Sequence, residues 1–332
     1  MDNTAAFLAN HWILIAFMAP LFWSLVNIID VYFVDGIYKD ELDGSIISGL
    51  FQIIPWFILI FLVDIRLVDI FNPQDPNTFF FIDNTLLLSL FGGIVYVLGI
   101  YFYFKALFNS NDAPLLQILA NMAVIAVPLF SFLLFREQLP LSGYTGMLIT
   151  FCGATVLSFN PHLRKKLSGK YFKIMLGAVL LMSLSMVIEN HAYGLLENSY
   201  GARSFWLGFL FFSLGAFLGA LLLAIYAKRN PLPTIRKYYG IFFIGEGLYF
   251  LGNFASQKAI SIAPSVSYVA LIETFGPVFI MAYSLLIIFF SSFLLHKKTA
   301  AVKRIYSEQI GGIWVKVLAT VIMAVGVYVI SS

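Results

Sequence analysis

Three glutamates stand inside long apolar stretches of the sequence, at Glu189, Glu246 and Glu273. A charged side chain at the centre of a membrane helix costs about 2.5–3.5 kcal/mol on insertion scales, so acids in such surroundings are candidates for function. Counting turns from the face that their two stretches share puts Glu189 and Glu273 each about two turns deep, where they could meet. Two close carboxylates in a low dielectric cannot both ionise, so we expect this pair to hold a proton or to bind a cation.

Other polar side chains share these apolar stretches. The set that we expect to line the binding path beside the two carboxylates consists of Asn27, Tyr96, Gln117, Asn121, Glu246, Tyr249 and Asn253. The alternative for each glutamate is a structural bond to a neighbouring helix backbone or to Lys258. Lys105 and Lys258 near span ends either reach the membrane interface or form an anion-binding pair. Aromatic rings in these stretches either bind a solute or only pack.

The composition requires lipid around most of the molecule. Of 332 residues, 61% are hydrophobic and 11% are charged, against about 25% charged in an average soluble domain. A water-soluble fold of this size cannot hide so much apolar surface. The first apolar stretch, 11–34, lacks preceding basic residues and a cleavage site, so we expect a retained span rather than a signal peptide.

Motifs for several other classes of protein are missing from the sequence. A single cysteine, Cys152, excludes a disulfide framework and a thiolate metal site. The four histidines are far apart, so no metal-ligand spacing occurs; they are His11, His162, His191 and His296. The sequence has no phosphate-binding loop, no nucleophile elbow and no basic stripe for nucleic acid. We therefore expect no cofactor, no metal, no nucleic-acid partner and no enzymatic activity.

Apolar windows of about twenty residues predict about ten membrane helices, in an all-α membrane protein. The predicted spans are 12–34, 44–63, 85–107, 114–135, 142–160, 173–195, 204–227, 239–260, 264–295 and 310–330. The basic link 162–170 divides them into two sets of five. This division predicts one transmembrane domain, 1–332, made of a first five-helix repeat, 1–161, and a second, 171–332.

An internal alignment supports the division, because segment 92–106 matches segment 245–259 without gaps. Gly92, Tyr96, Leu98, Gly99, Lys105 and Ala106 fall on Gly245, Tyr249, Leu251, Gly252, Lys258 and Ala259. With small changes in spacing, Pro114 falls on Pro264 and Pro128 on Pro277. Since each half has an odd number of spans, the repeats must be inverted, and such repeats place a substrate site where the halves meet.

The sequence resembles the EamA-type ten-span members of the drug/metabolite transporter superfamily. The resemblance rests on the small-residue and Trp opening at 20–24, on the region 101–159 with its internal Pro128 and with Glu137 opening the fifth helix, and on segment 257–283. It implies a transporter with helices 1, 3, 4, 6, 8 and 9 around a central cavity, and it names no solute. The long ninth span and the basic link 296–308 depart from the family pattern.

The basic residues divide unevenly between the two predicted membrane faces. The face that carries the termini holds four of the 20 Lys and Arg, which leaves sixteen on the other face; the four are Arg66, Arg136, Arg203 and Lys258. The positive-inside rule then places both termini outside the cell membrane, the inner membrane of a bacterium. Members of the resembled family usually keep their termini in the cytoplasm, so the two indications disagree here.

These observations favour a secondary transporter that moves a small organic metabolite by alternating access, with a proton as the possible coupling ion. The alternative is a flippase, or a flippase accessory, for a lipid-linked headgroup. A polar cavity closed to lipid would favour the transporter. A lateral apolar groove would favour the flippase. The expected partners are a small-molecule substrate, the lipid bilayer, a proton and a second copy of the chain as a homodimer.

Overall fold

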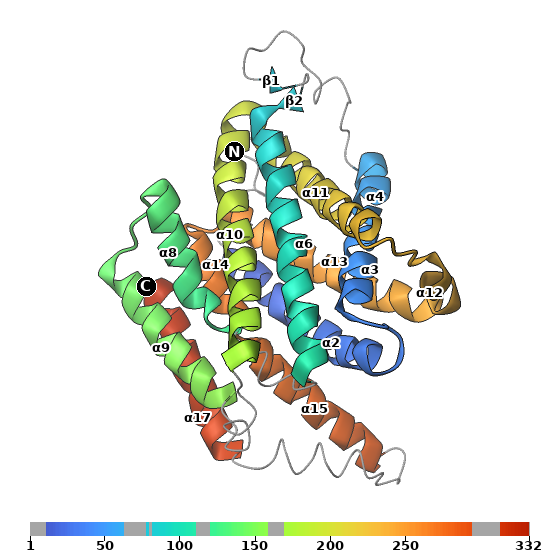
Figure 1. Cartoon of the computed structure of the whole chain (residues 1–332). Helices are drawn as coiled ribbons and strands as arrows, with labels where there is room; N and C mark the ends of the chain where they lie inside the picture. The colour runs from blue at the N-terminus through green and yellow to red at the C-terminus, as the bar shows by residue number, and fades with distance from the viewer. Residues whose placement is uncertain are drawn as a thin grey trace.

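The computed structural model describes residues 11–62, 78–79, 82–110, 120–158, 169–293 and 313–331. These residues form a bundle of helices with one very short hairpin (Figure 1). The helices of the first half are α2 (Trp12–Gly36), α3 (Glu41–Phe51), α4 (Ile54–Leu62), α6 (Asn84–Ser110), α8 (Ala123–Phe135) and α9 (Leu141–Ser158). Those of the second half are α10 (Gly169–Tyr200), α11 (Ser204–Tyr226), α12 (Leu232–Lys237), α13 (Tyr239–Ile262), α14 (Val266–Glu273), α15 (Gly276–Phe293) and α17 (Ile313–Ser331).

The helices make this a multi-pass membrane protein. Six stretches of the described residues are long and apolar enough to cross a bilayer: Trp12–Gly36, Glu41–Leu59, Asn84–Asn109, Tyr171–Tyr226, Val266–Leu286 and Ile313–Ser331. The fourth contains two helices, α10 and α11, joined by the short 3-10 turn Gly201–Arg203. Ala123–Phe135 and Leu141–Leu157 are shorter apolar helices. The predicted all-α membrane fold is confirmed at this level.

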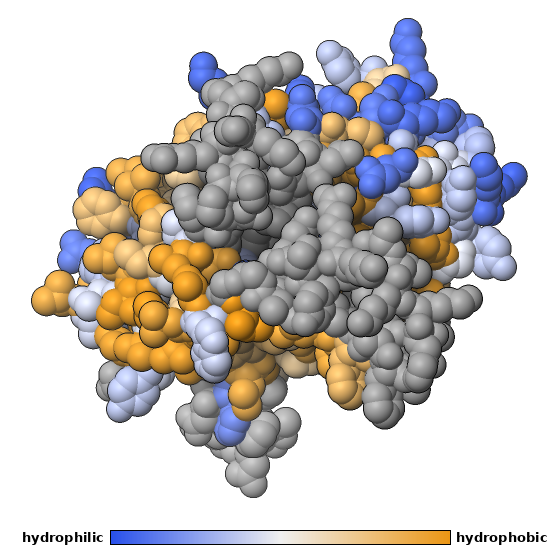
Figure 2. All heavy atoms as spheres, turned by 90° about the horizontal axis from the view of Figure 1, so that it is seen from below, coloured by the Kyte–Doolittle hydropathy of each residue, from blue (hydrophilic) through white to orange (hydrophobic). Residues whose placement is uncertain are grey.

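Large apolar side chains cover much of the outside. Trp314, Leu148 and Leu222 are more than half exposed, as expected for residues that face lipid. Seen from below, apolar side chains spread over one side of the molecule, while hydrophilic side chains gather on the opposite side (Figure 2). The molecule thus presents to its surroundings the apolar surface that the composition required.

Prolines interrupt two of the predicted spans. The stretch predicted as 264–295 is divided between α14 and α15, which end and begin around Thr274 and Phe275. Pro277 has no N–H to donate, so the backbone bonds of a continuous helix cannot all form there. In the same way α3 and α4 are separated just before Pro55. Between them Ile53 N–H donates to Leu50 O at 3.3 Å, which is the three-residue spacing of a 3-10 turn. Each break produces two helices where the sequence predicts one.

The hairpin differs from the prediction of an entirely helical chain. β1 (Thr78–Phe79) pairs antiparallel with β2 (Ile82–Asp83), and each strand has two residues. Asp83 Oδ1 accepts a hydrogen bond at 2.7 Å from Thr85 N–H in the first turn of α6, which satisfies one of the free donors at the start of that helix. The hairpin lies in the polar break between the predicted second and third spans.

Helices from the two halves are interleaved rather than side by side. α6 packs along α10, α13 packs along α2, and α17 packs along α9 (Figure 1). Glycines permit the closest of these approaches: a Cβ at Gly93 of α6 would overlap the carbonyl of Phe212 on α11, and one at Gly215 would overlap the carbonyl of Leu90. This interleaving creates the space at the centre of the bundle.

Candidate functional site

A cavity of about 220 Å³ lies at the centre of the bundle. Its walls come from α2, α3, α6 and the start of α8 in the first half, and from α10, α11, α13, α14 and the start of α15 in the second. The polar residues that line it are Ser24, Asn27, Asp30, Ser48, Tyr96, Tyr103, Asn121, Ser183, Ser185, Glu246, Tyr249, Asn253, Ser256, Gln257, Glu273 and Thr274. Six of the predicted path residues, and Glu273, therefore lie on one cavity, and Gln117 lies outside the described residues.

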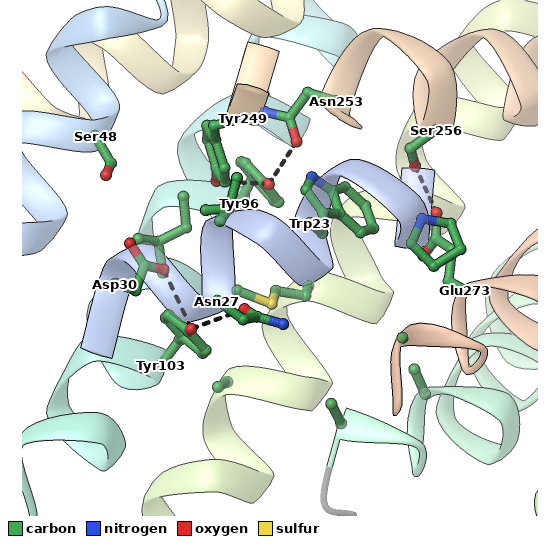
Figure 3. A pocket seen from close by; sticks show the side chains of 18 of the residues that line it. Trp23, Asn27, Asp30, Ser48, Tyr96, Tyr103, Tyr249, Asn253, Ser256 and Glu273 are labelled. Carbon is green, nitrogen blue, oxygen red and sulfur yellow. Dashed lines mark hydrogen bonds between the residues drawn. The ribbon is translucent and has the colours of Figure 1, made fainter. Parts of the chain in front are cut away.

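Two tyrosines meet at the middle of the cavity. The hydroxyls of Tyr96 on α6 and Tyr249 on α13 are 2.7 Å apart (Figure 3). The Tyr96 hydroxyl donates to Asn253 Oδ1 at 2.9 Å, so the single remaining hydrogen for the tyrosine pair comes from Tyr249. Asn253 Nδ2 in turn donates to Gln52 Oε1 at 3.3 Å. This chain of bonds links α3, α6 and α13 across the cavity.

One end of the cavity carries two acids. The hydroxyl of Tyr103 on α6 lies 3.0 Å from Asn27 Oδ1 and 3.2 Å from Asp30 Oδ2, within hydrogen-bonding distance of both (Figure 3). Ser48 Oγ on α3 donates to Glu246 Oε1 at 2.9 Å. Both acids are buried, Asp30 with 7% and Glu246 with 5% of its surface exposed. Charged oxygens this deep need polar partners or a compensating cation.

The third acid, Glu273, lies apart from the first two. Its Oε1 accepts a hydrogen bond from Ser256 Oγ on α13 at 2.6 Å, and Trp23 stands between this pair and Asp30 in the view of Figure 3. Glu273 is the last residue of α14, immediately before the break that Pro277 accompanies. A carboxyl group at a helix break beside an open cavity is accessible to water or to a solute.

Glu189 does not join Glu273 as predicted. Its carboxyl oxygens form no hydrogen bond with any residue that the structure describes, and the side chain is 0% exposed. α10 lies in close contact with α6 at this level. Ser185, one helical turn before Glu189, donates a hydrogen bond from its Oγ to Gly92 O at 2.9 Å. The Glu189 carboxyl fills the space beside Gly92, and it is outside the cavity lining. The expected direction of the side chain was wrong because the two helices touch at this level.

The two lysines point away from the carboxylates. Lys105 Nζ donates to the hydroxyl of Tyr101 at 3.1 Å. Lys258 Nζ lies over the ring of Phe205, 4.5 Å from its centroid, and does not bond Glu273. Neither lysine lines the cavity. A cation–π contact of this kind stabilises a lysine close to the membrane interface.

Asn121 has an unexpected environment. It is completely buried, it lines the cavity, and neither side-chain amide atom has a hydrogen-bond partner among the described residues. An amide left in this way loses the bonds that it would form with water, at a cost of about 1–3 kcal/mol for each group. Such a side chain is available to a polar solute in the cavity.

Sequence reasoning missed several polar residues of the cavity. Asp30 is an acid within an apolar stretch, the same signal that singled out the glutamates, but the predicted binding path left it out. Ser48, Ser256 and Tyr103 carry no such signal, because serine and tyrosine are common in membrane helices without any role in binding. Their places became evident only from the packing of α3, α6 and α13.

Comparisons with known proteins establish the fold and nothing finer. No family model and no curated protein matches the sequence. One solved structure, described only as "Crystal structure of protein", is similar with a TM-score of 0.61 and 15% identity, over 96% of this chain and 94% of that chain. The fold therefore exists in a solved protein over nearly its whole length. At this identity the likeness carries no activity, because one fold hosts many functions.

The described residues contain no cluster of three or more His, Cys, Asp or Glu that could hold a metal ion. The chemistry that the cavity offers is thus that of carboxylates, amides, hydroxyls and aromatic rings. Hydrogen bonding, charge pairing and cation–π contact are the interactions available to a bound solute.

Proposed function

We propose that the protein is a secondary transporter that carries a small organic solute by alternating access. Its ten spans form two inverted repeats, 1–161 and 171–332, and the solute binds in the cavity between them. The observation that carries this proposal is the buried polar cavity, whose walls come from both halves. Polar groups are costly at this depth of a membrane protein and mark solute pathways.

The tyrosine contact supports the inverted repeat. Tyr96 and Tyr249 occupy equivalent positions in the two aligned segments, and their hydroxyls meet. A pseudo-two-fold axis in the membrane plane brings equivalent residues face to face in this way. The contact therefore fits an axis that passes through the cavity.

The neighbours of two equivalent glycines also fit such an axis. Gly99 of α6 faces Met182 of α10, and Gly252 of α13 faces Trp23 of α2. The third helix of each repeat thus packs along the first helix of the other repeat. This exchange of partners is expected when two copies of one motif are related by a two-fold rotation.

Polar contacts join the halves at both ends of the bundle. Arg229, between α11 and α12, forms an ion pair with Asp40 at the start of α3. Elsewhere Ser265 Oγ donates to Glu137 Oε1 at 2.5 Å. On a ten-span count these two contacts lie on opposite membrane faces. Alternating access requires each to break when the cavity opens to its side.

We place the coupling proton on Glu273, with Glu189 as a second protonatable group in the seam between α6 and α10. Transport then needs no covalent chemistry and no cofactor. The protein resides in the bacterial inner membrane with both termini outside, because sixteen of its 20 basic residues fall on the other face.

Ligand screening of the purified protein tests the proposal. A solute that binds only the folded state raises the unfolding temperature by mass action. Metabolites should be screened at two pH values, and each stabilising compound then tested for counterflow in proteoliposomes. Counterflow of a water-soluble compound supports the transporter. Movement of a labelled lipid between leaflets, without solute counterflow, would instead support the flippase alternative.

A further inference from the structure

The side chains of charged type that line the cavity are all acids. Asp30, Glu246 and Glu273 line it, whereas none of the lining residues is a lysine, an arginine or a histidine. The nearest lysines of these helices are engaged elsewhere, Lys105 with Tyr101 and Lys258 with Phe205. A cavity with ionised carboxylates on its walls and no lysine, arginine or histidine attracts positive charge.

Two of the acids, Asp30 and Glu246, stand on α2 and α13, which pack against each other. Gly245 of α13 lies against Phe33 and Ile29 of α2, at 3.3 and 3.4 Å from where its Cβ would be. Glu246 and Asp30 are the chain neighbours of these contact residues, and both line the cavity. Two ionised carboxylates in one buried cavity repel each other, and a cation bound between them removes this cost.

Glu246 has an oxygen ready for a ligand. Its Oε1 accepts the hydrogen bond from Ser48, while Oε2 has no partner among the residues that the structure describes. The residue is 5% exposed and lines the cavity. A buried acceptor without a donor is costly, and an ammonium group supplies both donors and the missing positive charge.

Aromatic rings complete the surroundings of such a ligand. Trp23 and Tyr103 stand on either side of Asn27 (Figure 3), and the Tyr103 hydroxyl lies 3.2 Å from Asp30 Oδ2. The negative faces of aromatic rings attract cations and pack against flat apolar groups. The cavity volume of about 220 Å³ is below the range of about 300–1,000 Å³ typical for drug-sized ligands. A ligand must therefore be small.

We propose that the cavity binds a small organic amine as a cation, with its ammonium group between Asp30 and Glu246 and its apolar part against Trp23 and Tyr103. This assignment rests on the proposed function of the same cavity and adds the chemical class of its substrate. Glu273, beyond Trp23, is left free for the proton.

A matched series of probes tests the class of ligand. Benzylamine, benzyl alcohol and benzoate share one ring and differ in charge, and each is added to purified protein at pH 7 while the unfolding temperature is recorded. Benzylamine should raise this temperature, and the other two should have little effect. Equal stabilisation by benzyl alcohol, stronger stabilisation by benzoate, or none by benzylamine would overturn the proposal.

Variants locate the binding group. Glu246→Gln and Asp30→Asn should each weaken benzylamine binding about tenfold or more, because each replaces a carboxylate acceptor by a neutral amide and removes one negative charge. Glu246→Gln keeps an acceptor for Ser48, which preserves the fold. Asp35→Asn is the control, since Asp35 is an exposed acid of the same helix outside the cavity lining. Wild-type affinity in both cavity variants would disprove the assigned site.

Counterflow of labelled benzylamine in proteoliposomes separates the two proposals. Binding without counterflow would leave the cation site standing and remove the transport function. Counterflow of benzoate or benzyl alcohol, without that of benzylamine, would leave transport standing and remove the cation assignment. The assignment and the function together predict binding and counterflow of the amine alone.

Discussion

The hydroxyl groups of Tyr96 and Tyr249, at equivalent positions of two aligned segments, are 2.7 Å apart. The Tyr96 hydroxyl makes two hydrogen bonds, because it also donates to Asn253. In this network the Tyr249 hydroxyl makes only the bond to Tyr96. The two equivalent residues thus carry unequal roles, which mutations can separate.

Tyr96→Phe should destabilise the protein more than Tyr249→Phe. The first change removes both bonds and leaves Asn253 Oδ1 without its donor, at a cost of about 1–3 kcal/mol. The second removes one bond, at about 0.5–1.5 kcal/mol. Thermal unfolding in detergent measures both. Tyr226→Phe, at a side chain that is 89% exposed, serves as the control and should match wild type. A larger loss in Tyr249→Phe would contradict the assigned direction of the bonds.

Glu273→Gln should fold normally and lose uptake driven by a proton gradient, while exchange of solute across the membrane is retained. The glutamine oxygen can still accept the hydrogen bond of Ser256, but the amide cannot release a proton. Uptake and exchange assays in the same proteoliposomes distinguish the two activities. If Glu273 is only structural, the change should lower the unfolding temperature and leave the pH dependence of uptake intact.

Gly92→Ala should destabilise the seam between α6 and α10 by about 1–3 kcal/mol, because its Cβ would overlap the Glu189 carboxyl. Removing that carboxyl in the double variant Gly92→Ala, Glu189→Ala should restore part of the loss. Gly247→Ala is the matched control: nothing lies within 4 Å of its Cβ, and alanine should stabilise α13 by up to about 1 kcal/mol. Equal effects at Gly92 and Gly247 would show that Glu189 does not fill this seam.

Both termini should lie outside the cell. The sixteen basic residues on one predicted face, against four on the other, motivate this orientation. A tag placed after Ser332 should be labelled by an impermeant reagent in intact cells. Labelling that needs permeabilised cells would return the protein to the topology usual in the resembled family.

Six of the seven path residues predicted from the sequence line the cavity, whereas neither the direction of Glu189 nor several polar residues of the lining were predicted. Tyr96 and Tyr249 were singled out as matched positions of the repeat, and Asn253 as a polar residue inside an apolar stretch. Glu189 was misplaced because α10 is apolar on nearly all sides, so hydropathy gives no facing direction. The hydrogen bond between Ser48 and Glu246 depends on the packing of α3 against α13. The sequence around either residue does not predict this packing.

Cross-linking across the two ends of the bundle tests alternating access most directly. Because Cys152 is the single cysteine, Cys152→Ser gives a cysteine-free background. Into it are introduced Asp40→Cys with Arg229→Cys or, separately, Glu137→Cys with Ser265→Cys, at positions in contact across the halves. Solute counterflow in proteoliposomes is then measured before and after treatment with a bifunctional methanethiosulfonate reagent long enough to join the two cysteines, with a compound that stabilises the protein in the screen. The account predicts that either cross-link stops counterflow and that a reductant restores it. Wild-type counterflow in fully cross-linked protein would contradict a transporter that opens alternately at its two ends.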